Sequence, residues 1–130
     1  MKMVHSCIRV LDDAKSVAWY KDAFDLDIVD QLDFESFRLT YLANTFSGFE
    51  LELTLNKDRT EPYALGDGYA HLAFVVEDVD ALHAQLSETG IDVGPLVDFA
   101  PGGALVARFF FATDPDGYKI EVIQKGGRFT

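Results

Sequence analysis

Short alternating runs of hydrophobic and polar residues cover most of the chain, and two stretches follow a helical period instead. Residues 4–10 alternate and include β-branched side chains, a pattern that is typical of a β-strand. A helix is predicted over residues 14–24, because Asp12 or Asp13 can cap its first turn. Apolar residues three and four positions apart mark the face of this helix that should be buried. They are Val17, Tyr20 and Phe24.

The second half of the chain repeats the order of elements in the first half. Further strands are predicted after the first helix, at residues 26–32, 37–43 and 49–55. The repeated elements are a strand at 69–76, a helix from Asp78 or Asp80 to about residue 88 that Gly90 should cap, and strands at 91–97, 105–112 and 118–124. The pattern predicts an α+β fold of two tandem βαβββ modules.

Neither predicted module is large enough to bury its sheet alone, so residues 1–130 are expected to form a single domain. Its modules should span about residues 1–57 and about residues 68–125, joined by a polar linker over residues 57–68 that contains proline and glycine. A sheet that curves around one face would form a cavity between the predicted elements.

Each module carries one histidine and one glutamate at matching places. His5 and His71 are the second residues of their apolar runs and lie 66 positions apart. Glu52 and Glu121 lie in the last strands of the two modules, 69 positions apart. A slip of a few residues over half a chain is what loop insertions produce between two copies of one module.

Strand alternation places these four side chains on the face that the helices do not cover. Leu51 and Leu53 should pack against a helix, so Glu52 and its neighbour Glu50 point the other way. Glu50 is therefore an alternative to Glu52. The spacing favours Glu52, because His71 precedes Glu121 by 50 residues, while His5 precedes Glu52 by 47 and Glu50 by 45.

Imidazole and carboxylate groups together suit divalent first-row metals. Taken alone, a histidine in a strand is more often a core or surface residue than a ligand, and a glutamate in a strand is usually part of a solvated face. The coincidence of both residue types at both matching places favours a metal site and an enzyme. Its predicted ligands are His5, Glu52, His71 and Glu121.

Composition and charge exclude several other classes. With 48% hydrophobic residues and 11 Phe, the chain has ample material for a core and is not expected to be disordered. Its net charge of −11 argues against nucleic acids and anionic membranes as partners. Cys7 is the single cysteine, which excludes an intrachain disulfide and fits a reducing cytoplasm. No signal peptide or membrane span is expected.

Three other polar features have structural interpretations. His83 lies on a predicted helix outside the repeat and is expected to be an exposed helix residue. Cys7 should act as a small filler on the ligand face. The segment Asp114-Pro115-Asp116-Gly117 is typical of a tight turn between two strands, in which proline and glycine set the backbone angles.

Most of the chain, from residue 1 to about 124, resembles glyoxalase I (lactoylglutathione lyase), a family of the vicinal oxygen chelate superfamily. The four ligand positions, with Asn56 after Glu52, are the most specific part of this resemblance. The motifs that carry it are Val4-His5 with Ile8-Arg9-Val10, Glu52-Leu53-Thr54-Leu55-Asn56, Gly68-Tyr69-Ala70-His71 and Asp114-Pro115-Asp116-Gly117-Tyr118-Lys119-Ile120-Glu121.

The resemblance implies a homodimer in which His5 and Glu52 of one subunit and His71 and Glu121 of the other bind one divalent metal. Nickel or cobalt is favoured, and zinc is possible. The implied reaction converts the hemithioacetal of methylglyoxal and glutathione to S-D-lactoylglutathione by proton transfer through a metal-bound enediolate. Glu121 is then the main base, Glu52 serves the opposite face, and Arg9 and Asn56 hold the glutathione moiety.

The chain departs from the family in the loop over residues 99–104. Family members often carry a lysine there that meets a glutathione carboxylate, and this loop has none. Arg108 lies nearby in sequence, so the thiol and the role of Arg108 stay open. The alternatives are another metal-dependent enzyme of the superfamily, such as an acyl-CoA epimerase or a thiol-transferring resistance enzyme, and a metal-free small-molecule-binding relative.

Overall fold

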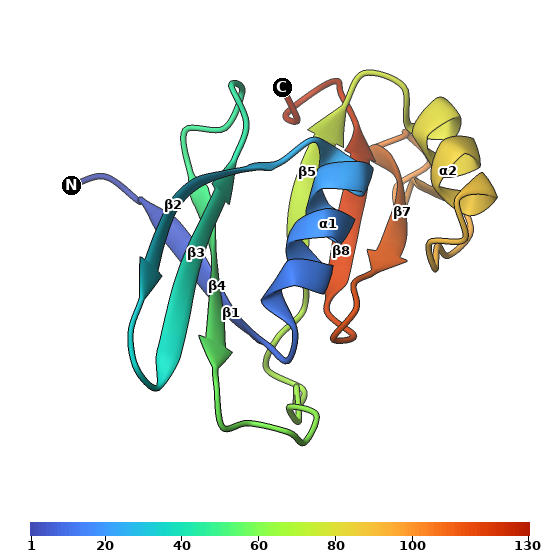
Figure 1. Ribbon diagram of the computed structural model, residues 1–130. Coiled ribbons are helices and arrows are strands. Elements are labelled where there is room, and N and C mark those ends of the chain that lie inside the picture. The colour runs from blue at the N-terminus through green and yellow to red at the C-terminus, as the bar shows by residue number, and fades with distance from the viewer. The chain divides into compact units, whose positions relative to one another are not determined.

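A computed structural model describes the whole chain, residues 1–130, and the chain divides into two compact units, Met1–Ala64 and Leu65–Thr130. The boundary falls inside the linker predicted over residues 57–68. Each unit has one strand, one helix and then three strands, in the order β1-α1-β2-β3-β4 and β5-α2-β6-β7-β8 (Figure 1). The predicted α+β fold of two βαβββ modules is confirmed.

The first unit forms a four-stranded mixed sheet in the order β1-β4-β3-β2. Strand β1 pairs with β4 in parallel, and the remaining pairs are antiparallel. Helix α1 contacts β2 and β4. The elements are β1 (His5–Val10), α1 (Asp13–Phe24), β2 (Asp27–Asp33), β3 (Phe37–Ala43) and β4 (Glu50–Asn56).

The second unit repeats this arrangement in a sheet with the order β5-β8-β7-β6. The pairing of β5 with β8 is parallel, as in β1 and β4, and β7 pairs antiparallel with both β6 and β8. Helix α2 contacts β7 and β8. The elements are β5 (Leu72–Val76), α2 (Val79–Glu88), β6 (Val97–Phe99), β7 (Ala107–Thr113) and β8 (Lys119–Gln124).

Both helices begin at a capping aspartate. The side chain of Asp12 accepts a hydrogen bond from Lys15 N at 3.0 Å, and that of Asp78 accepts one from Ala81 N at 2.9 Å. Gly90, with φ of +79°, follows α2 and provides the left-handed turn expected of it. Neither helix is long and apolar enough to cross a membrane.

The buried face of α1 differs from the predicted one. Tyr20 and Phe24 are buried as expected, but Val17 is only half-buried. Ser16 and Asp13 are buried instead. Asp13 is tolerated there because Arg38 donates to both of its oxygens, at 2.7 and 3.0 Å.

The prediction of a strand over residues 91–97 is wrong. Strand β6 is Val97–Phe99, and upstream of it only Val93 forms an isolated bridge, with Ala112. The backbone leaves the sheet after Gly94, whose N–H bonds to Phe111 O at 2.8 Å, because Pro95 follows and has no N–H to continue the ladder.

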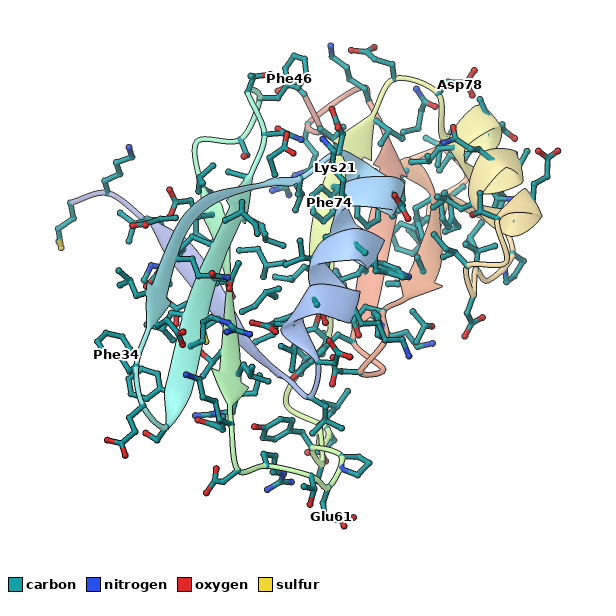
Figure 2. All side chains as sticks on the ribbon, viewed as in Figure 1. Lys21, Phe34, Phe46, Glu61, Phe74 and Asp78 are labelled. Atoms are coloured by element: carbon teal, nitrogen blue, oxygen red, sulfur yellow. The ribbon has the colours of Figure 1, made fainter.

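Large apolar side chains are exposed at both ends of the first sheet. Phe34, in the turn between β2 and β3, is 47% exposed, and Phe46, between β3 and β4, is 95% exposed (Figure 2). The outer strand β2 also exposes apolar side chains, of Ile28, Val29 and Leu32. The edge strand β2 thus exposes apolar and polar side chains together.

Candidate active site

In the first unit, His5 and Glu52 form a close pair. His5 begins β1 and Glu52 lies in the middle of β4, and their Nε2 and Oε2 atoms are 3.1 Å apart. The His5 side chain is 40% exposed and that of Glu52 only 11%. The edge of the His5 ring meets Tyr41, with 5.8 Å between ring centroids. Tyr41 thus packs against the pair within the unit, and the His5 side chain is the more exposed of the two.

The second unit contains a matching pair. His71 precedes β5 and Glu121 lies in β8, and their Nε2 and Oε2 atoms are also 3.1 Å apart. Side-chain exposures are 37% and 16%. Phe111 stands where Tyr41 stands in the first unit, with 5.5 Å between its ring centroid and that of His71. The duplicated residues thus occupy the same geometry twice.

The sheet registers show which glutamate of the first unit matches Glu121. In the parallel pairs, Cys7 lies opposite Glu52 and Ala73 lies opposite Glu121. Glu50, which lies opposite His5, corresponds to Lys119 in the second unit, two residues before Glu121. The carboxylate that reaches the histidine is Glu52, so geometry and register agree with the spacing of the sequence.

Glu52 has polar neighbours that the sequence pattern did not identify. Thr54 Oγ1 donates to Glu52 Oε1 at 3.4 Å and lies 3.1 Å from the Cys7 sulfur. Partial burial raises the pKa of the Cys7 thiol. Cys7 is nevertheless exposed in the single chain, so its role as a small filler stays a prediction. Loss of solvation, with a hydrogen bond to Glu52, raises the pKa of the Tyr41 hydroxyl. Tyr41 is the cross-strand neighbour of Glu52 in the β3–β4 pairing.

The chemistry of the two pairs fits a divalent metal. Each pair offers one imidazole nitrogen and one carboxylate oxygen, the donors that zinc, nickel and cobalt accept. No group of three or more His, Cys, Asp or Glu side chains gathers at one point of the chain. Each pair alone is thus half of the predicted four-ligand set.

A separate open pocket of about 420 Å³ lies in the first unit. It contains Arg9 and Asn56, the two residues predicted to hold substrate, together with Asp58, Arg59 and Tyr63. Asn56 Nδ2 donates to Tyr63 Oη at 3.0 Å. Arg59 and Tyr63 follow β4 in the linker, where no periodic pattern marks a site, so sequence reasoning missed them.

The structure corrects one of the remaining expectations and supports another. His83 is half-buried rather than exposed, because its Nε2 lies 2.8 Å from Gly94 O and its ring meets Phe110 edge-on at 4.9 Å. Asp114 does form the predicted tight turn. Its carboxylate accepts the N–H groups of Asp116 and Tyr118, both at 2.9 Å.

Arg108 is held by two carboxylates of its own unit. Its Nε and Nη2 donate to Asp80 at 3.0 and 2.7 Å, and its Nη1 donates to Asp98 at 2.8 Å. These hydrogen bonds raise the pKa of Arg108 and lower the pKa of Asp80. Arg108 thus links β7 to α2 and β6. All three of its side-chain nitrogens already donate to aspartates, so Arg108 has a structural role rather than a ligand-binding one.

The comparison with protein families decides the class. The model of the Glyoxalase/Bleomycin resistance protein/Dioxygenase superfamily matches residues 2–122. The chain belongs to this superfamily. Among named relatives, a lactoylglutathione lyase of Neisseria meningitidis is 36% identical over 96% of this chain and 91% of its own length. A probable lactoylglutathione lyase of Synechocystis is 35% identical over 98% of both chains.

Solved structures of this superfamily share the fold. The trypanothione-dependent glyoxalase I of Leishmania major superposes with a TM-score of 0.77, at 30% identity over 95% of this chain and 86% of its own. The glyoxalase I of Zea mays gives a TM-score of 0.82 at 27% identity, and this chain spans 45% of it. The chain is thus similar over nearly its full length to glyoxalase I enzymes.

Proposed function

We propose that the protein is a metal-dependent glyoxalase I. The observation that carries this proposal is the pair of equivalent His–Glu contacts, His5–Glu52 and His71–Glu121, each 3.1 Å long. The similarity to lactoylglutathione lyases supports the same reaction. The substrate is the hemithioacetal of methylglyoxal with a thiol, and the product is the thioester of D-lactate.

The reaction moves one proton between neighbouring carbons. A carboxylate of the site takes the proton from the carbon that bears the hydroxyl and the sulfur, which leaves an enediolate. The proton then returns to the adjacent former ketone carbon, and the hydroxyl proton passes to that carbon's oxygen. The first oxygen becomes the thioester carbonyl, so no oxidant or reductant is needed. A divalent ion held at the site would supply positive charge that stabilises the enediolate.

The residues of the chain divide this work. The ion would be held by His5, Glu52, His71 and Glu121. Glu121 also carries the proton on one face of the substrate and Glu52 on the other. Both carboxylates have limited exposure, which reduces the water that competes for them. Thr54 orients Glu52 by a hydrogen bond, and Tyr41 lies opposite Glu52 on the neighbouring strand.

The complete site needs two half-sites, and a homodimer that combines the His5–Glu52 pair of one subunit with the His71–Glu121 pair of the other supplies them. The metal expected is nickel or cobalt, with zinc as an alternative. The thiol expected is glutathione, held by Arg9 and Asn56. The trypanothione-dependent relative shows that the thiol can vary within this type of enzyme, and the loop over residues 99–104 lacks a lysine.

One assay tests the proposal directly. Metal-free protein is reconstituted with nickel, cobalt or zinc and supplied with methylglyoxal and glutathione, and thioester formation is followed by absorbance. We expect turnover that requires metal and thiol together. Stoichiometric metal binding without turnover would favour another enzyme of the superfamily, and the absence of metal binding would favour a metal-free binding protein.

A further inference from the structure

The pocket beside β1 and β4 carries positive charge on an acidic chain. The whole chain has a net charge of −11, yet the residues that line this pocket include two arginines, Arg9 and Arg59, and one acidic residue, Asp58. A local excess of positive charge in an acidic protein favours an anionic ligand at that place.

Arg59 forms no ion pair with an acidic side chain. Its Nε donates to Glu61 O at 2.7 Å and its Nη2 to Pro62 O at 3.0 Å, and both acceptors are neutral backbone carbonyls. In contrast, Arg38 and Arg108 are each paired with two aspartates. The remaining N–H groups of Arg59 are therefore available to a ligand.

The Arg59 guanidinium is fixed by an aromatic ring as well as by the backbone. Its central carbon lies 4.4 Å from the centroid of the Tyr63 ring, within the range of a cation–π contact. The hydroxyl of the same Tyr63 accepts the hydrogen bond from Asn56 Nδ2 at 3.0 Å. Tyr63 thus links Arg59 to a residue of the proposed substrate site.

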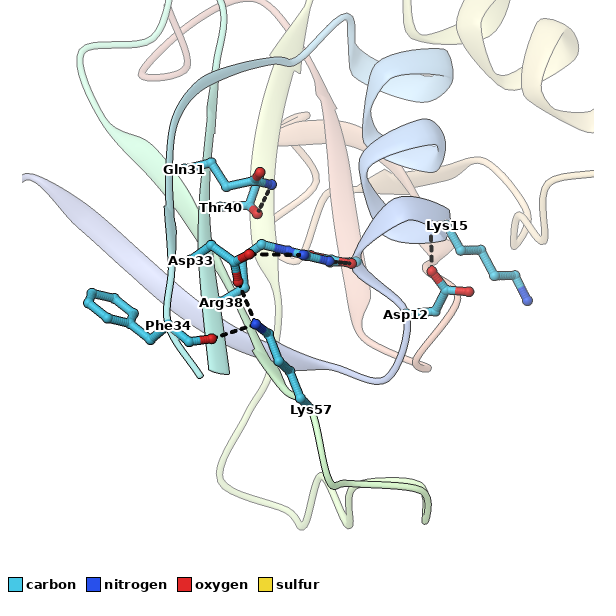
Figure 3. A network of polar contacts seen from close by, with 9 residues as sticks. Asp12, Lys15, Gln31, Asp33, Phe34, Arg38, Thr40 and Lys57 are labelled. Atoms are coloured by element: carbon cyan, nitrogen blue, oxygen red, sulfur yellow. Dashed lines mark hydrogen bonds and ion pairs between the residues drawn. The ribbon is translucent and has the colours of Figure 1, made fainter. Parts of the chain in front are cut away.

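The loop that presents Arg59 is tied to the sheet at its start. Lys57 Nζ binds Asp33 at 2.6 Å and also donates to Phe34 O (Figure 3). Lys57 N donates to Ser36 O at 2.9 Å, and Arg59 N donates to Asn56 O at 3.1 Å. The loop continues beyond the end of β4 to Glu61 (Figure 2). An anchored loop lowers the entropic cost of placing a binding group.

From these contacts we propose that Arg59 is a second anion-binding residue of the Arg9–Asn56 pocket and takes a carboxylate of the thiol cosubstrate. The proposal rests on the proposed glyoxalase function. Arg59 would then bind a carboxylate of the thiol, the role that a lysine in the loop over residues 99–104 has in other family members. The contact is made equally in the ground state and the transition state, because it lies on the thiol and away from the reacting carbons.

The test compares steady-state kinetics of Arg59→Gln with those of the wild type and of a matched control. Arg128→Gln removes the same charge from another exposed arginine that lies over an aromatic ring, Phe129, in the second unit. We expect Arg59→Gln to raise KM for the glutathione hemithioacetal about tenfold with kcat unchanged, as for a lost charge-assisted contact. Arg59→Lys should recover part of the loss, and Asp58→Asn should lower KM.

Esterification of one glutathione carboxylate tests which carboxylate Arg59 contacts. With glutathione monoethyl ester, whose glycine carboxylate is blocked, wild type and Arg59→Gln should have similar KM values. A defect of Arg59→Gln that persists with the ester would still support the anion contact and assign it to the glutamyl carboxylate. Equal KM values of Arg59→Gln and Arg128→Gln with unmodified glutathione would overturn the proposal.

A failure of the proposed function can be told apart from a failure of this inference. Wild-type protein that shows no turnover with any metal would contradict the glyoxalase proposal alone. Titration calorimetry with S-methylglutathione then decides the role of Arg59. Weaker binding by Arg59→Gln than by wild type and Arg128→Gln would support it, whereas equal binding, or no binding by wild type, would refute it.

Discussion

His5 Nε2 lies 3.1 Å from Oε2 of Glu52. The residue directly opposite His5 in the parallel β1–β4 ladder is nevertheless Glu50. The same offset recurs in the second unit, where Glu121 reaches His71 while Lys119 holds the place of Glu50. Two glutamates that point the same way along one strand are thus distinguished by a feature that both units share.

Glu52, and not Glu50, should bind the metal. We expect Glu52→Ala to lose much of its metal and Glu50→Ala to keep it, because only the Glu52 carboxylate lies beside His5. Elemental analysis of both purified variants measures the difference, and circular dichroism checks that both are folded. Metal loss from Glu50→Ala with retention in Glu52→Ala would instead identify Glu50 as the ligand.

Two inactive variants should complement each other if sites are shared between subunits. His5→Ala and His71→Ala each disable one half-site type, so either variant alone should have no intact four-ligand set. A mixed dimer would combine the intact His71–Glu121 pair of one chain with the intact His5–Glu52 pair of the other. Refolding the two together should restore one metal site and turnover per mixed dimer. Failure to recover either on mixing would argue against sites shared between subunits.

Most of the fold could be predicted because alternation and capping residues are local signals. The strand Phe37–Ala43 has the predicted bounds, and both helices begin at the predicted aspartates. The apolar content of residues 91–97 wrongly predicts a strand, because Pro95 has no N–H for ladder pairing. A pattern of hydrophobic residues does not reveal that Pro95 lacks a backbone N–H.

The site was only partly predictable for a different reason. The His–Glu pairs were visible because the repeat marks them twice. Tyr41 reaches Glu52 across the sheet, and Arg59 reaches the pocket from a linker, so neither position has a partner at a fixed sequence distance. His83 likewise owes its burial to Gly94 and Phe110, which lie on other segments. Contacts made by tertiary structure carry no local signature.

The ion pair of Arg108 with Asp80 should make stability depend on acid pH. Hydrogen bonds from Arg108 lower the pKa of Asp80 in the folded protein, so this contribution is present above the ordinary aspartate pKa and is lost as pH falls through the lowered value. Arg108→Gln should therefore unfold at a lower temperature than wild type at neutral pH. We expect this difference to narrow below about pH 4. Thermal unfolding across pH, with Arg128→Gln as control, measures it, and a constant difference would contradict the assignment.

Glu121 should act as both metal ligand and proton carrier. A neutral amide can still offer an oxygen to a metal, but it cannot accept the substrate proton. Glu121→Gln should therefore retain appreciable metal and lose turnover by a factor on the order of 10²–10⁴, the usual worth of a positioned base. Glu52→Gln should lose less, since that carboxylate serves the other substrate face. Turnover must be measured at saturating metal, with the content confirmed by elemental analysis, so that weaker binding is not mistaken for lost catalysis. Near-normal turnover of metal-loaded Glu121→Gln would move the base role to Glu52.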